Sequence, residues 1–403
     1  MKDFWRKKMN PSHKVFNTLI EEYYSSLFKA KEEGRKVGWC TSNFPIEIPE
    51  SLGLEICFPE NHSATLANST EGEKYLLVAE EHGYSNDLCS YARINLGYIE
   101  SFDSRVRNLP KPDFLLCSSN TCHQLLKWFE ILKERFQIPL YLIDIPQTMK
   151  GKVDEDTLLY VSSQIGEVIE SLAEFTNTTF SNERFSEVLE IASACGKVWR
   201  NIHSLLSSTP SPINGFDLFV MMSLMVVRRG RKETLDAFRL YESELRSMVQ
   251  EKKSRYPGKE KQRVYLEGLT CWANLMEMQL PLLERGINLV GSTYTELFGL
   301  VYDSYPEMVK AYCEIPNALS LEEGILRRKD AILKSKADGI LFNVTRSCRI
   351  WCGNEYEMER RLQEETGLPT LVFDGDQADK RNFSYAQYET RVQAFDEIMK
   401  ENR

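Results

Sequence analysis

The sequence lacks an excess of positive charge and any apolar run long enough to span a bilayer. Its 403 residues include 50 Lys and Arg against 59 Asp and Glu, a formal net charge of −9 at pH 7. Such a chain has no general basic face, so we expect neither a nucleic-acid partner nor an anionic membrane surface. The longest apolar run, residues 216–227, contains Asp217 and is too short to cross a membrane.

Export signals and familiar zinc motifs are missing as well. The charged start, residues 1–8, is not followed by an apolar segment, so we expect a cytoplasmic protein. Only five histidines occur, and none has the His-Glu-x-x-His spacing of a zinc site. Ten cysteines stand out against this background. In a long chain without a signal, a disulfide framework is not expected, and most cysteines are small buried hydrophobes.

Short apolar stretches alternate with helical periods in two parts of the chain. The predicted strands are residues 37–40, 54–58, 113–117 and 140–144, and later residues 264–271, 287–291, 339–343 and 369–374. This alternation is typical of parallel, doubly wound sheets. The middle of the chain has long amphipathic periods and few strand signals. We therefore predict an α/β fold with two doubly wound sheet domains, residues 1–153 (with a leading helix) and 259–403, separated by a helical domain, residues 154–258.

The two sheet regions repeat one order of motifs. Residues 111–116 precede a cysteine-containing loop, and the next strand ends at Asp144. Residues 336–342 likewise precede Cys348, and the strand after them ends at Asp374. The repetition predicts an internal duplication of a Rossmann- or flavodoxin-like unit.

The position of each cysteine relative to the predicted strands distinguishes candidate ligands from core residues. Ligands of doubly wound sheets bind at the carboxyl ends of the strands. Cys117 ends a predicted strand, and Cys348 lies in the matching loop of the second unit. Cys89 lies at a predicted helix start, where Asp87 is a candidate cap and backbone N–H groups would support a thiolate.

Other cysteines compete with these three or belong to the core. Cys122 and Cys352 lie close beyond two of the candidates, and Cys40 precedes a strand-end loop. The remaining cysteines have apolar, helical or strand-interior neighbours: Cys57, Cys195, Cys271 and Cys313. Three thiolates from distant loops, without a Cys-x-x-Cys pair, suit an iron–sulfur cluster better than zinc.

Seven motifs occur together and in order. They are Gly38-Trp39 with Thr41-Ser42 and Pro45, residues 59–61, residues 83–93, residues 112–117, residues 214–217, residues 346–348 and residues 373–379. With them the chain resembles the 2-hydroxyacyl-CoA dehydratase / benzoyl-CoA reductase family from about residue 23 to residue 399. It looks most like the α subunit of the (R)-2-hydroxyacyl-CoA dehydratases.

The resemblance implies a cofactor and a set of site residues. In this family each of two related subunits holds a [4Fe–4S] cluster, and the α subunit leaves one iron without a cysteine. Carried over by motif, the ligands are Cys89, Cys117 and Cys348, although Cys40 and Cys122 contest the assignment. Ser42 matches a serine at the thioester carbonyl. Glu60 matches a glutamate near the substrate that would transfer a proton or assist departure of the hydroxyl group.

The resemblance also implies a reaction and its partners. The family enzyme eliminates water from (R)-2-hydroxyacyl-CoA to give 2-enoyl-CoA through a ketyl radical anion, in anaerobic amino-acid fermentation. A homologous β subunit completes a heterodimer, and a separate ATP-hydrolysing iron–sulfur activator injects one electron. The chain has no Gly-x-x-x-x-Gly-Lys-[Ser/Thr] loop, consistent with ATP hydrolysis on another protein.

Two other readings remain open at the level of sequence. One is a subunit of a benzoyl-CoA reductase-type enzyme, which shares the motifs. The other is a non-catalytic subunit that only relays electrons, against which Ser42 and Glu60 speak. The motifs leave the identity of the acyl group open.

Overall fold

Two four-stranded parallel sheets form the frame of the protein. The structure is a computed structural model that describes residues 10–69, 71–147 and 153–402. The first sheet contains β1 (Val37–Cys40), β2 (Glu55–Cys57), β3 (Phe114–Ser118) and β4 (Leu140–Ile143). The second contains β5 (Gln262–Glu267), β6 (Ile287–Ser292), β7 (Gly339–Thr345) and β8 (Thr370–Gly375). The α/β class and all eight predicted strands are confirmed.

The two sheets have the same strand order. It is β2-β1-β3-β4 in the first sheet and β6-β5-β7-β8 in the second, with every pair parallel. The central strands are buried along their whole length, because helices cover both faces of each sheet. Full burial explains why these strands read as continuous apolar runs rather than alternating ones.

Helices follow the strands in both halves. In the N-terminal half they are α2 (Pro11–Glu32), α3 (Glu47–Ser51), α4 (Pro59–Ala67), α5 (Gly72–Glu81), α6 (Ser90–Tyr98) and α7 (His123–Phe136). In the C-terminal half they are α13 (Leu275–Arg285), α14 (Thr293–Glu296), α15 (Tyr305–Cys313), α16 (Leu321–Ser335), α17 (Arg349–Cys352), α18 (Glu355–Thr366) and α19 (Tyr385–Glu401). No helix in the described ranges is long and apolar enough to cross a membrane.

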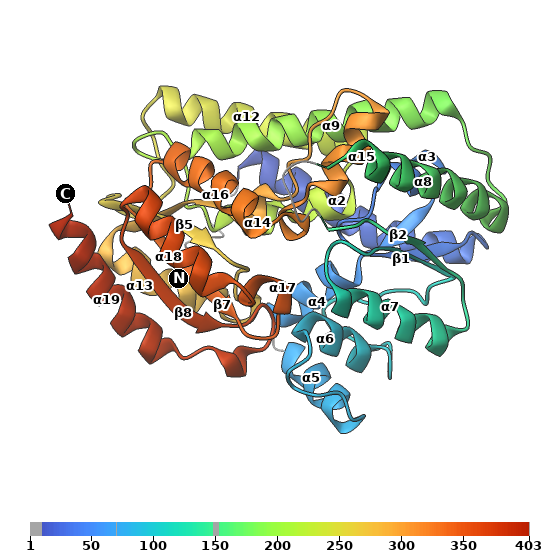
Figure 1. Ribbon diagram of the computed structural model, residues 1–403, viewed down its shortest axis with the longest axis horizontal. Coiled ribbons are helices and arrows are strands. Elements are labelled where there is room, and N and C mark those ends of the chain that lie inside the picture. The colour runs from blue at the N-terminus through green and yellow to red at the C-terminus, as the bar shows by residue number, and fades with distance from the viewer. Residues whose placement is uncertain (1–9, 70, 148–152, 403) are drawn as a thin grey trace.

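The middle of the chain is helical and contacts both halves. Its helices are α8 (Glu155–Thr176), α9 (Asn182–Leu205), α10 (Asp217–Met221), α11 (Ser223–Val227) and α12 (Lys232–Gln250). Helices α9 and α12 run side by side along one edge of the molecule, with the two sheets at opposite ends (Figure 1). Helix α9 contacts α3 in the N-terminal half and α14 in the C-terminal half. Gly196 also lets α9 lie against the segment that follows α14, because a Cβ there would lie 1.8 Å from the Leu300 carbonyl oxygen.

Candidate active site

A cavity of about 410 Å³ lies where strand ends of both sheets meet. Ser42 and Glu60, which follow β1 and β2, line it from the N-terminal half. Tyr294 and Gln377, which follow β6 and β8, line it from the C-terminal half. The carboxyl ends of parallel strands are the expected place for a ligand in this fold.

Ser42 and Glu60 are hydrogen-bonded to each other in this cavity. Glu60 lies in the first turn of α4, and its Oε2 accepts a hydrogen bond from the Ser42 backbone N–H at 2.6 Å. Burial raises the pKa of the Glu60 carboxyl, and hydrogen bonding to Ser42 only partly opposes the rise. The structure thus brings the two predicted residues together around a carboxyl group that holds a proton more readily than an exposed one.

Three thiols line the same cavity: those of Cys89, Cys122 and Cys348. They come from three separate loops, and each cysteine is the residue that caps the start of a helix, namely α6, α7 and α17. The Cys122 Sγ accepts a hydrogen bond from the Leu125 backbone N–H at 3.3 Å. Helix starts place unpaired N–H groups beside a sulfur atom, which favours its thiolate form.

The predicted cap of α6 is wrong. The residue that begins this helix is Cys89, whereas Asp87 is exposed. Hydrogen bonds from Leu88 N to the Ser85 carbonyl and from Asp87 N to Ser85 Oγ form a turn before the helix, and Asp87 lies on that exposed turn.

Cys117 does not line the cavity. It lies within β3, is 0% exposed, and packs among the core residues of the first sheet. Strand β3 extends one residue further, to Ser118, before the loop begins. Cys40 is buried in β1 in the same way, and Cys352 also lies outside the cavity lining. Of the residues that competed with Cys117, Cys122 is therefore the one that the structure places at the cavity.

Burial dominates the acid–base properties of the three thiols. It raises the pKa of Cys89 to about 11 and that of Cys122 to about 12. It also raises the pKa of Cys348, and the nearby thiols of Cys89 and Cys122 add to the rise. The sulfur atoms of Cys89 and Cys122 thus lie within electrostatic reach of the Cys348 sulfur.

Aromatic side chains form another part of the cavity lining, and of these only Tyr91 lies in one of the sequence motifs. The Trp272 indole N–H donates to the Tyr91 hydroxyl at 2.6 Å, and that hydroxyl lies 3.5 Å from the hydroxyl of Tyr294. Tyr294 stacks against Phe219 with ring centroids 6.3 Å apart. Helical and strand periodicity carried no signal for these residues, since they converge from segments far apart in the sequence.

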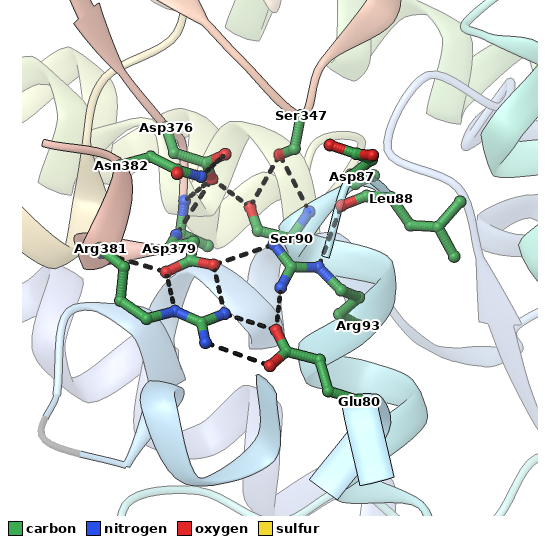
Figure 2. A network of polar contacts seen from close by, with 12 residues as sticks. Glu80, Asp87, Leu88, Ser90, Arg93, Ser347, Asp376, Asp379, Arg381 and Asn382 are labelled. Atoms are coloured by element: carbon green, nitrogen blue, oxygen red, sulfur yellow. Dashed lines mark hydrogen bonds and ion pairs between the residues drawn. The ribbon is translucent and has the colours of Figure 1, made fainter. Parts of the chain in front are cut away.

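A buried polar network lies beside Cys89 and Cys348 and joins the two halves of the chain (Figure 2). The Ser90 backbone N–H donates to Ser347 Oγ at 3.2 Å, and Ser90 Oγ donates to Asp376 Oδ1 at 2.5 Å. Farther out, Arg93 is paired with Glu80 at 2.7 Å and with Asp379 at 3.0 Å.

The charges in the network are balanced in pairs. Burial acts to raise the pKa of Asp379, but hydrogen bonds from Arg381 and the charge of Arg93 outweigh it and lower that pKa. Arg381 also contacts Glu80, so the two carboxylates and the two guanidinium groups form one closed cluster. The cluster fixes the start of α6 against the loop that follows β8.

The three thiols at the cavity are the ligand type by which an iron–sulfur cluster would be held. Within the described ranges, no group of three His, Cys, Asp or Glu side chains is close enough to hold one ion. A cluster binds each thiolate through a different iron, so its sulfur ligands need not converge on one atom. Cys89, Cys122 and Cys348 line one cavity, each from a different loop.

Thiols, a serine and a carboxyl with a raised pKa share one cavity at the strand ends of two parallel sheets. This combination is typical of the active site of an α/β enzyme. Comparison with known sequences narrows the class. The family model described as 2-hydroxyglutaryl-CoA dehydratase, D-component, matches residues 41–399. The chain belongs to this family of 2-hydroxyacyl-CoA dehydratase subunits, which are hydro-lyases.

Curated relatives match along nearly the whole chain. The (R)-phenyllactyl-CoA dehydratase alpha subunit of Clostridium sporogenes is 42% identical over 92% of this chain and 91% of its own length. The (R)-2-hydroxyisocaproyl-CoA dehydratase alpha subunit of Clostridioides difficile is 40% identical over 96% of both chains. The (R)-2-hydroxyglutaryl-CoA dehydratase subunit alpha of Acidaminococcus fermentans is 35% identical over 98% of both.

Proposed function

We propose that the chain is the α-type subunit of an (R)-2-hydroxyacyl-CoA dehydratase, which removes water from its substrate to give 2-enoyl-CoA. The observation that carries the proposal is the single cavity in which the Ser42–Glu60 pair and the thiols of Cys89, Cys122 and Cys348 meet. The similarity to three dehydratase alpha subunits supports the same reaction.

We further propose that Cys89, Cys122 and Cys348 hold a [4Fe–4S] cluster with one iron free of cysteine. Cys122 replaces Cys117 in this assignment because it lines the cavity and begins a helix, whereas Cys117 is enclosed within the sheet. When bound, such a cluster supplies a Lewis-acid position and single-electron chemistry next to the substrate.

Glu60 is the proton carrier in this proposal. Elimination needs a proton for the departing hydroxide and a base for the β-proton of the substrate. One electron added to the thioester gives a ketyl radical anion, in which hydroxide leaves and the β-proton becomes acidic. A protonated Glu60 carboxyl, favoured by its raised pKa, protonates the hydroxide, and the resulting carboxylate then accepts the β-proton. Glu60 and the electron are both restored, so the reaction is redox-neutral.

Ser42 positions the substrate and Glu60 together. Its backbone N–H donates to Glu60 Oε2, and its hydroxyl group, which also contacts the Glu60 carboxyl, would turn to hydrogen-bond the thioester carbonyl when the substrate is bound. The aromatic wall of Trp272, Tyr294 and Phe298 excludes water from the same space. Both roles belong to residues that contact the reacting groups.

The cavity favours an apolar acyl chain. Among the described residues that line the cavity, Glu60 is the only carboxylate and Arg107 the only guanidinium group. Arg107 is already paired with Glu21. A second carboxylate on the substrate would lack a free cationic partner there. We therefore propose substrates with alkyl or aromatic side chains.

The proposal includes partners that the chain itself does not contain. A homologous β subunit completes the enzyme, and an ATP-hydrolysing iron–sulfur activator supplies the electron, in the cytoplasm of an anaerobic cell. The equal strand orders of the two sheets support an origin by duplication of one α/β unit. Because Ser42 and Glu60 face the cavity, a subunit that only relays electrons is disfavoured, and the dehydratase names of the relatives favour elimination over ring reduction.

The test is anaerobic co-purification of the chain with its β subunit, followed by assay with the activator and ATP. We expect iron and sulfide in the complex and elimination of water from (R)-2-hydroxyacyl-CoA thioesters with apolar side chains. Full turnover by the single chain alone, or a complex without iron, would contradict the proposal. A benzoyl-CoA reduction assay on the same preparation separates the two chemistries.

A further inference from the structure

The buried side chain of Gln377 connects the polar network to the thiol wall, which is the part of the cavity lining formed by Cys89, Cys122 and Cys348. It is 0% exposed and lines the cavity, and its Nε2 donates a hydrogen bond to Cys89 Sγ at 3.2 Å. Neither Ser42 nor Glu60 contacts it, and the elimination described above does not use it. A buried amide directed at a sulfur ligand needs a role of its own.

The orientation of the Gln377 amide is fixed by its other neighbour. The Ser347 hydroxyl lies 3.4 Å from Gln377 Oε1 and 3.4 Å from Ser90 Oγ, and its one proton is shared between these two acceptors. If the amide were reversed, a carbonyl oxygen would face the Cys89 sulfur and two lone-pair acceptors would meet. The N–H group therefore points at Cys89.

The backbone that carries Gln377 is also held firmly. The Trp272 backbone N–H donates to the Gln377 carbonyl at 3.0 Å. Asp376, the preceding residue, accepts hydrogen bonds from Ser90 Oγ and from the backbone N–H groups of Ala378 and Asp379. Gly375 lets β8 pass close to its neighbours, since a Cβ there would lie 2.4 Å from Asn343 Oδ1. The amide is thus positioned by the chain on both sides.

The two cysteines nearest this network are flanked by residues that bond each other. Ser90 directly follows Cys89, Ser347 directly precedes Cys348, and the Ser90 N–H donates to Ser347 Oγ. The network consequently holds two sulfur ligands from opposite halves of the chain at a fixed separation, and Gln377 donates from its centre (Figure 2 shows the surrounding contacts).

We propose that Gln377 is a positioning residue that sets the reduction potential of the cluster through its hydrogen bond to Cys89. The inference rests on the proposed function, because it presupposes the cluster. A hydrogen bond to a sulfur ligand stabilises the reduced cluster, which carries more negative charge, and so raises its potential. The amide of Gln377 thereby sets the reduction potential of the cluster to a value at which the cluster can both pass an electron to the substrate and take it back.

The experiment compares Gln377→Leu and Gln377→Glu with the wild-type complex of both subunits, purified without oxygen. Leucine removes the donor, and glutamate replaces it with an acceptor of similar size. We expect both variants to keep their iron, and we expect a lower reduction potential in an EPR-monitored titration, with the larger shift for glutamate. Gln262→Leu is the matched control. Gln262 is also a buried amide, it lies at the first position of β5, and its side chain donates to the Asp396 backbone carbonyl.

The outcomes separate this inference from the proposed function. A potential equal to that of wild type in both iron-containing variants overturns the inference. Loss of iron from both variants also overturns it, because Gln377 would then be required to bind the cluster rather than to tune it. A wild-type complex without iron contradicts the proposed function instead.

Discussion

The two halves of the protein share a frame but contribute differently to the site. In each half the second strand is followed by a helix whose second residue faces the cavity: Glu60 in α4 and Tyr294 in α14. In each half the third strand is followed by a cysteine that begins a helix: Cys122 before α7 and Cys348 before α17. The same strand order in the two halves therefore places side chains of different chemistry at corresponding positions of the cavity.

The asymmetry lies in the connection between the second and third strands. In the N-terminal half this connection includes α5 and α6 and delivers Cys89 to the cavity. In the C-terminal half the matching connection carries Cys313, which is buried in the core. The N-terminal half thus supplies two thiols and the carboxyl, whereas the C-terminal half supplies one thiol and the aromatic and amide groups around it. A repeated frame can keep its strand ends while its connections specialise.

The largest effect that we expect is loss of iron, which tests which thiols each half contributes to the site. Cys89→Ala, Cys122→Ala and Cys348→Ala should each remove nearly all the iron of this subunit, because a cluster held by three thiolates has no spare protein ligand. Cys117→Ala should keep the iron and cost roughly 1 kcal/mol of stability through a small cavity. Iron content and visible absorbance of anaerobic complexes measure both.

The control for this series is Cys195→Ala, which removes a buried thiol far from the sheets, in α9. If Cys117→Ala emptied the site and Cys122→Ala did not, the thiol assignment from the cavity lining would be wrong.

The next effect compares the matched positions Glu60 and Tyr294. Glu60→Gln should keep the iron and lower turnover by about 10²-fold or more, because it removes the proton carrier while preserving shape. Tyr294→Phe should lower turnover by less than about tenfold, since the ring that shapes the cavity remains. Steady-state rates with one acyl-CoA measure both, and equal losses in the two variants would contradict the division of roles.

A smaller effect compares the first residues after β4 and β8. Asp376→Ala should lower the free energy of unfolding by about 2–3 kcal/mol, because buried N–H groups of Ala378 and Asp379 lose their acceptor. Asp144→Ala, whose partners Ser119 and Tyr160 are more exposed, should cost about 1 kcal/mol or less. Urea titrations of the two variants measure the difference, and a larger loss for Asp144→Ala would reverse the ranking.

The smallest effect concerns the histidine contribution to acid stability, which lies in the N-terminal and middle parts because residues 259–403 contain no histidine. Burial lowers the pKa of His62 from 6.5 to about 4. Below pH 6.5 the unfolded chain takes up a proton that folded His62 does not, so stability is lost as pH falls from 6.5 towards 4. Between pH 7 and pH 5.5 this costs about 1 kcal/mol.

His62→Gln should remove that part of the pH dependence, as measured by urea titrations at the two pH values. An unaltered dependence in His62→Gln would show that another group carries the acid sensitivity.

The sequence was sufficient for the strands because full burial leaves a local signature of continuous apolar residues, as in Val37–Cys40 and Gly339–Thr345. Ser42, Glu60, Cys89 and Cys348 were accessible for a similar reason, since strand ends and helix starts can be located along the chain. Their chemical roles came from the family motifs.

The placement of Cys117 and Cys122 relative to the cavity depends on a detail that periodicity does not resolve. A strand that ends one residue later encloses Cys117 in the sheet, and only the helix start at His123 brings Cys122 to the cavity. Gln377 lies in the motif of residues 373–379, but neither its role nor Trp272 was predicted, because their contacts join segments distant in sequence, for which a single chain gives no local signal.

The hydrogen bond between Ser90 and Ser347 spans 257 positions of the chain. During synthesis, Cys89 and Cys122 leave the ribosome long before Cys348, so the thiol wall cannot close until translation is nearly complete. Domains emerging first fold first. The three thiols therefore come together only in the finished polypeptide, and a nascent or truncated chain that ends before β7 exposes two of them without the third.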